Sequence, residues 1–135
     1  SVRASGGLPS HYAPLTPIEA WGRDVLWQRH FELAKQGVRV AVLGISPAPA
    51  ASEGAGVVFY PMPPEAVDYG RVLYDTLRRA DAARLDRLLA EAPPGGDSWR
   101  AVADRLSRAS RKAQMDEQTQ PAGNRLASTH KDQGV

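Results

Sequence analysis

Hydrophobic and polar positions divide the chain into short apolar runs and longer amphipathic stretches. The clearest run is Val38–Ile45, which is almost entirely apolar and is bounded by Gly37 and Pro47. A strand that is apolar on both sides is buried on both faces, which is typical of a parallel sheet covered by helices. Weaker runs predict three further strands, over residues 17–21, 57–60 and 85–91.

Amphipathic spacing predicts three helices between and after these strands. Asp24 is the expected N-cap of the first helix, which Gly37 ends. Pro64 is expected in the first turn of the second helix, and Asp97 or Ser98 is expected to cap the third. The expected core stripe of the second helix consists of Ala66, Gly70, Leu73 and Leu77, and Tyr69 and Tyr74 are expected to flank it.

The resulting order of elements, β-α-β-β-α-β-α, defines a small three-layer α/β domain with a mostly parallel sheet. Glycines and prolines make residues 1–14 an extended segment, the leader, which is typical of an interdomain linker. From residue 113 the composition becomes polar, so residues 113–135 are expected to form a flexible tail. The predicted domain therefore covers residues 15–112.

The composition fits one domain and excludes several function classes. With 135 residues, 42% of them hydrophobic, the chain can bury a real core. Its 17 basic and 15 acidic residues lack the basic stripe of a nucleic-acid binder. The absence of cysteine excludes disulfides, and no apolar run approaches the ~18 residues of a membrane span. The absence of cysteine also fits a reducing compartment, and because the chain starts without methionine or a signal peptide, we expect a cut in the coding sequence upstream of Ser1 rather than processing.

Three other features of the sequence favour ordinary structural explanations. The loop Ser46–Gly56 follows the strongest strand but lacks the G-x-G-x-x-G and G-x-x-x-x-G-K-[ST] patterns and any lysine, which favours a plain surface loop. Asp81, Asp86 and Arg87 are expected to form a solvated helix end with local ion pairs. His30 is expected to be a partly covered surface group, and no pair of histidines has metal-ligand spacing.

His11 and Tyr12 stand between proline-bearing segments of the leader. Such a pair either latches the leader to the domain or lies across a substrate pocket as a lid. In a lid, the phenol and the imidazole would supply hydrogen-bond donors and a flat stacking face. The spacing alone leaves both interpretations open.

Three stretches of the sequence resemble a known family. The leader and first strand, RASGGLPSHYAPLTPIEAW, resemble the interdomain linker of the two-domain threonylcarbamoyl-AMP synthases, where a Ser-Pro-Gly-Met…His-Tyr-x-Pro segment precedes the C-terminal domain. Later helices and a strand of that domain resemble DYGRVLYDTLRRAD and LDRLLAEAPPGGDSWRAVADRLSRAS. The resemblances occur in order and cover residues 3 to about 112.

The resemblance implies a cytoplasmic nucleotidyltransferase that joins L-threonine, bicarbonate and ATP, with magnesium, into threonylcarbamoyl-AMP and pyrophosphate, for threonylcarbamoyladenosine formation in tRNA. In that family the chemistry belongs to an N-terminal catalytic domain, which nothing in this chain matches. The C-terminal domain is Rossmann-like, and the linker lies across the mouth of the active site. The chain is therefore implied to be inactive alone, to bind no cofactor itself, and to close its leader over a catalytic domain supplied in cis or in trans.

Carried over by position, the implied lid residues are Gly6, Ser10, His11, Tyr12 and Pro14, and no catalytic or metal-binding residue is assigned. The leader departs from the family pattern, with Ser5 in place of a frequent proline, Gly7 in place of methionine and Pro9 in place of an earlier tyrosine. Within the domain, Gly70 replaces an alanine, and Trp99 replaces a small residue and is expected to cover the sheet edge.

Two further interpretations remain open at this stage. In the first, the chain is a free-standing interaction module that kept the fold and lost the catalytic activity. In the second, it is a small nucleotide-binding domain with its ligand at Ser46–Gly56.

Overall fold

A single sheet of four parallel strands forms the centre of the computed structural model, which describes residues 14–118, and the side chains of residues 14–110. The strands lie in the order β1-β4-β2-β3, with bounds β1 (Ile18–Trp21), β2 (Val40–Gly44), β3 (Val58–Pro61) and β4 (Arg87–Glu91). The helices are α1 (Arg23–Lys35), α2 (Ala66–Ala82) and α3 (Arg100–Gln118), with short 3-10 helices at Ala50–Ser52 and Asp97–Trp99.

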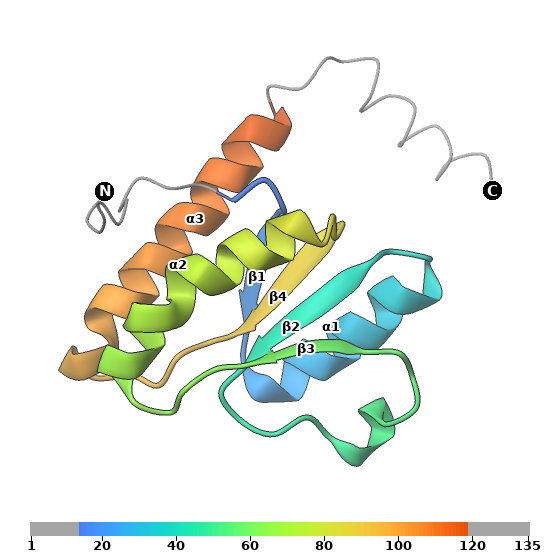
Figure 1. Ribbon diagram of the computed structural model, residues 1–135, viewed down its shortest axis with the longest axis horizontal. Helices are drawn as coiled ribbons and strands as arrows, with labels where there is room; N and C mark the ends of the chain where they lie inside the picture. Colours follow the sequence, from blue (N-terminus) through green and yellow to red (C-terminus); the bar gives the residue numbers. More distant parts are fainter. Residues whose placement is uncertain (1–13, 119–135) are drawn as a thin grey trace.

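The helices cover the sheet from both sides (Figure 1). Helix α1 packs on one face, and α2 and α3 pack together on the other. The parallel sheet, the three layers and the order of elements are as the sequence predicts, so the α/β fold class is confirmed.

Strand β2 is buried on both faces, as its continuous apolar sequence predicts. Ala41 and Leu43 face α2 and α3, whereas Val40 and Val42 face α1. Successive side chains of a strand point to opposite faces, so a central strand between two helical layers has no position left for a polar residue.

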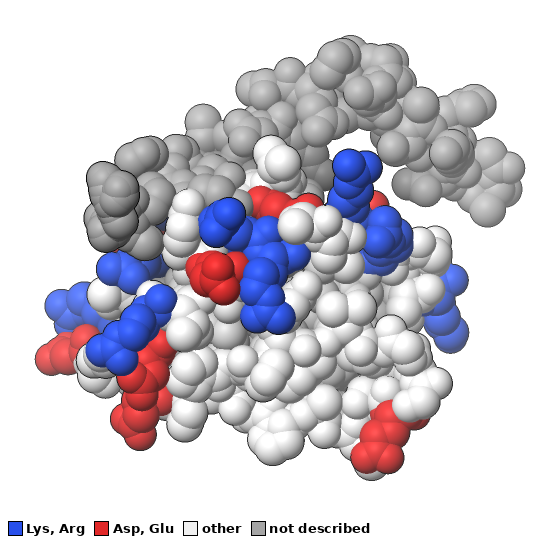
Figure 2. Space-filling model, in the orientation of Figure 1, with Lys and Arg blue, Asp and Glu red and all other residues white. Residues whose placement is uncertain are grey.

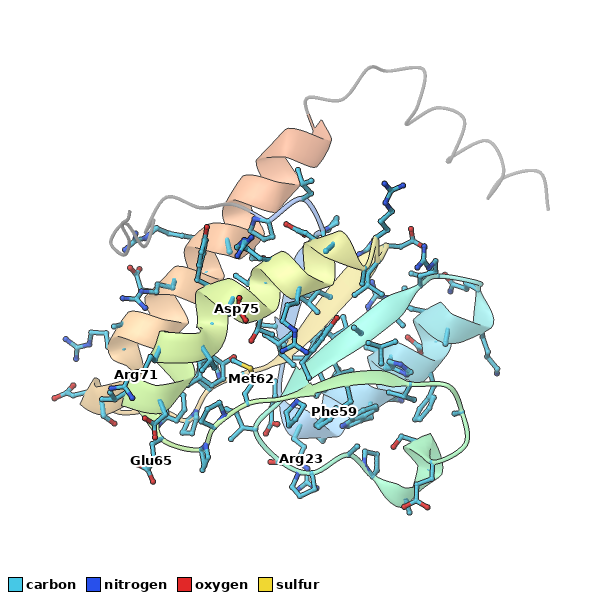
Figure 3. The ribbon with its side chains drawn as sticks, in the orientation of Figure 1. Arg23, Phe59, Met62, Glu65, Arg71 and Asp75 are labelled. Atoms are coloured by element: carbon cyan, nitrogen blue, oxygen red, sulfur yellow. The ribbon has the colours of Figure 1, made fainter. Side chains whose placement is uncertain are left out.

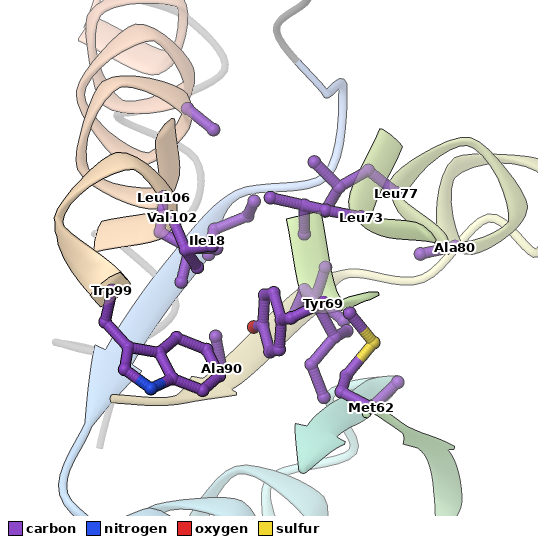
Figure 4. Close-up of a cluster of buried hydrophobic side chains, with 14 residues drawn as sticks. Ile18, Met62, Tyr69, Leu73, Leu77, Ala80, Ala90, Trp99, Val102 and Leu106 are labelled. Carbon is purple, nitrogen blue, oxygen red and sulfur yellow. The ribbon is translucent and has the colours of Figure 1, made fainter. Parts of the chain in front are cut away.

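Tyr69 of α2 occupies the middle of the larger core cluster (Figure 4). Its side chain is fully buried, so the expectation that it flanks the core stripe is wrong. The stripe is instead centred on Tyr69, Leu73, Leu77 and Ala80, which recur at helical spacing. Trp99, from the turn before α3, is also buried and meets the Tyr69 ring edge-on, with the ring centroids 5.5 Å apart.

Three helix ends differ from the sequence-based expectation. The N-cap of α1 is Gly22, and Asp24 lies in the first turn, where its carboxylate faces the positive end of the helix dipole. Helix α2 begins after the N-cap Glu65, so Pro64 precedes the helix. The turn Asp97–Trp99 comes before α3, so neither candidate residue caps that helix directly.

The predicted C-terminal end of α1 is confirmed at Gly37, whose φ is +84°. The Gly37 N–H donates to Ala34 O and the Val38 N–H to Leu33 O, each at 3.0 Å, which is the Schellman motif. Helix α3 ends at Gln118, beyond residue 112, and the domain bounds 1–14, 15–112 and 113–135 stay a prediction.

A smaller cluster of aromatic side chains joins α1 to the sheet. Phe59 of β3 stacks on Trp27 with ring centroids 6.0 Å apart, and Figure 3 shows it on the α1 side of the strand. Gly44 leaves room for this ring, because a Cβ at that position would lie 2.5 Å from Phe59 Cε1. His30 belongs to the same cluster, with its ring centroid 5.3 Å from that of Trp27.

Candidate functional site

The leader joins the folded domain at Pro14–Thr16, beside the C-terminal end of α2. The Asp81 carboxylate, in the last turn of α2, accepts three hydrogen bonds from this segment. Asp81 Oδ2 accepts from the Leu15 N–H at 3.0 Å, and Oδ1 accepts from the Thr16 N–H at 3.0 Å and the Thr16 hydroxyl at 2.8 Å. These residues, Pro14, Leu15, Thr16 and Asp81, are called the clamp below.

The clamp shows that Asp81 is more than a solvated residue at a helix end. Its hydrogen bonds connect positions 65 and 66 residues apart in the sequence, so the prediction of purely local interactions is wrong for this residue. A carboxylate that accepts bonds from two successive peptide N–H groups fixes the direction of the chain at that point. No pattern in the sequence points to this partner, because Thr16 lies 65 residues away along the chain.

Of the predicted lid residues, only Pro14 belongs to the described part of the chain. Its side chain is less than 2% exposed, whereas Leu15 beside it is 86% exposed. Gly6, Ser10, His11 and Tyr12 lie outside the described residues, and their assignment to a lid stays a prediction.

The carboxyl edge of the sheet holds a second arrangement of polar groups, around Glu91 at the end of β4. This carboxylate is 8% exposed. Its Oε1 accepts from the backbone N–H of Ile45 and of Ser46, at 2.8 and 2.9 Å, and its Oε2 accepts from the Ser46 hydroxyl at 2.9 Å. The sequence predicts Glu91 only as the end of a strand. The one sign of a buried role in the sequence is a carboxylate directly after the apolar residues Leu88–Ala90.

The Glu91 contacts bear on the nucleotide-binding alternative. In open α/β sheets, ligands bind at the carboxyl ends of the strands, and backbone N–H groups after a strand are the usual donors to a phosphate. In this domain the N–H groups of Ile45 and Ser46 already bind the chain's own carboxylate. An anion at this position would have to displace Glu91, which disfavours a nucleotide site at Ser46–Gly56.

Tyr69 of α2 lies near enough to this edge for its phenol to interact electrostatically with Glu91. Its hydroxyl is buried and has no hydrogen-bond partner among the described residues. Burial, followed by the negative charge of Glu91, raises the pKa of the Tyr69 phenol above its ordinary value. The phenol is therefore neutral at physiological pH and serves the core rather than acid–base chemistry.

Glu19 is the centre of an ion cluster on the α1 face of the sheet. Its carboxylate accepts from Arg29 Nε and Nη2, each at 2.8 Å, and from the Trp21 indole N–H at 2.7 Å. Arg87 of β4 also donates to Glu19. The predicted local pairing of Asp86 and Arg87 is thus wrong: Arg87 pairs across the sheet, and Asp86 accepts from the Arg39 N–H at 2.8 Å.

His30 is buried rather than partly covered, with 3% of its surface exposed, which corrects the sequence-based expectation. Trp27 and Phe31 of the same helix contact its ring. Its Nδ1 has no hydrogen-bond partner among the described residues, and burial lowers its pKa. Within the part of the chain that is described, no group of three or more His, Cys, Asp or Glu side chains is arranged to hold a metal ion.

Charged side chains of both signs are interspersed on the face shown in Figure 2. On α2, Arg71 pairs with Asp68 at 3.1 Å and Arg78 approaches Asp75 at 3.9 Å. Alternating charges of this kind form a solvated helix face rather than a basic stripe. No helix among the described residues is long and apolar enough to span a membrane.

Comparisons with known proteins point to one family. The sequence profile of the family described as "Threonylcarbamoyl-AMP synthase, C-terminal domain" matches residues 1–111. No curated protein matches the chain significantly.

Two solved structures share the fold. The chain is 26% identical to Sua5 of P. abyssi, solved in complex with L-threonine, with a TM-score of 0.58 over 76% of this chain and 30% of that protein. It is 24% identical to the C-terminal Sua5 domain of a hypothetical Sua5 protein from Pyrococcus horikoshii, with a TM-score of 0.52 over 70% of this chain and 93% of that domain. The chain thus spans about 30% of the full P. abyssi protein and most of the isolated domain.

Proposed function

The chain belongs to the family of the C-terminal domain of threonylcarbamoyl-AMP synthase, and on this premise we propose that it is an accessory domain. In this role it closes its leader over the active site of an N-terminal catalytic domain. The single observation that carries the proposal is the extent of the family match. It includes the leader together with the domain, residues 1–111, while the chain spans only 30% of the P. abyssi protein.

The proposed reaction of the two domains together is the joining of L-threonine, bicarbonate and ATP into threonylcarbamoyl-AMP and pyrophosphate, for tRNA modification in the cytoplasm. ATP, with magnesium, and threonine would bind to the catalytic domain, and this chain would bind no cofactor of its own. Its contribution would be to exclude water from a reactive mixed anhydride, which is a recognised role of lids. The crystal structure of the P. abyssi protein with L-threonine supports threonine as the amino-acid substrate.

Pyrophosphate release tests the proposal directly. The assay contains ATP, threonine and bicarbonate with this chain alone, a separately expressed N-terminal catalytic domain of a Sua5 protein, or both. We expect activity to appear or to rise only in the mixture. Equal rates with and without this chain, at concentrations that saturate binding, would refute the accessory role, and activity of this chain alone would refute the placement of the chemistry.

Two leader variants test the lid itself. His11→Ala and Tyr12→Phe should lower the rate of the mixture while leaving the Tm of this chain nearly unchanged, because a lid residue acts on the substrate. His130→Ala, in the predicted tail, is the matched control and should behave like the wild type. A large drop in Tm with normal turnover would instead identify His11 and Tyr12 as a structural latch.

A further inference from the structure

We draw no further inference here: the strongest candidate, the surface patch of Val58, Phe59 and Tyr60 along the edge strand β3, is only partly covered by the domain itself, and nothing in the part of the chain that the structure describes shows what else covers it.

Discussion

The ion cluster around Glu19 should give the domain a pH-dependent share of its stability. Arg29 donates two hydrogen bonds to this carboxylate, and Arg87 and Trp21 donate one each. The hydrogen bonds of Arg29, opposed by burial and supported by Trp21 and by the charge of Arg87, lower the pKa of Glu19 from 4.5 to about 2. The folded state therefore favours the ionised carboxylate.

The size of the effect follows from the pKa. At ~1.4 kcal/mol per pKa unit, the decrease of the Glu19 pKa from 4.5 to about 2 limits the contribution of Glu19 to the free energy of unfolding to about 3 kcal/mol. The side chains of Glu19 and Arg29 are 18% and 31% exposed, so solvent screening reduces the expected value to about 2 kcal/mol. Because the folded pKa is depressed, this stabilisation is complete above pH 4.5 and is lost as the pH falls toward 2.

Urea unfolding of Glu19→Gln, followed by tryptophan fluorescence, measures this contribution. We expect the variant to lose about 2 kcal/mol at pH 7, and less than half of that at pH 3, where the wild type has itself lost most of the benefit. Glu53→Gln, exposed in the loop after β2, is the matched control and should cost nothing measurable. A loss of equal size at pH 7 and pH 3 would refute the electrostatic reasoning, because the charge would then contribute nothing.

Two further predictions concern single positions on the helices. His30 is buried and its pKa is lowered, so the Tm should fall as the pH drops below about 6.5, where the unfolded chain binds a proton that the folded state does not. His30→Leu should remove this part of the pH dependence, and a variant whose Tm still falls with pH as in the wild type would contradict the role of His30. Gly70→Ala should raise the free energy of unfolding, measured in urea, by about 0.5–1 kcal/mol. The added Cβ would lie in ordinary contact, 3.4 Å from Arg105 Nη1 and 3.7 Å from Val102 Cγ2. A lower urea midpoint for the variant would show that the packing of α2 on α3 needs the glycine.

The sequence by itself determined the elements and the class of fold. Hydrophobic periodicity is a local property, so the strand at residues 40–44 and the end of α1 at Gly37 could be predicted from neighbouring residues alone. The ordered motifs of the leader and the later helices also pointed to the family, which the match over residues 1–111 bears out. The helix starts were less predictable, since Gly22 and Glu65, which make no side-chain capping bond, gave no signal.

Only the tertiary structure decided what the charged residues do. Asp81, Glu91 and Arg87 look like surface charges in the sequence, yet each bonds to a group more than 40 residues away. These partners meet because β4 inserts between β1 and β2, which places the end of α2 beside Thr16 and the end of β4 beside Ser46. Such contacts depend on strand order, and strand order depends on how the helices cover the sheet. Hydrophobic periodicity along one segment contains no information about the order of the strands in the sheet.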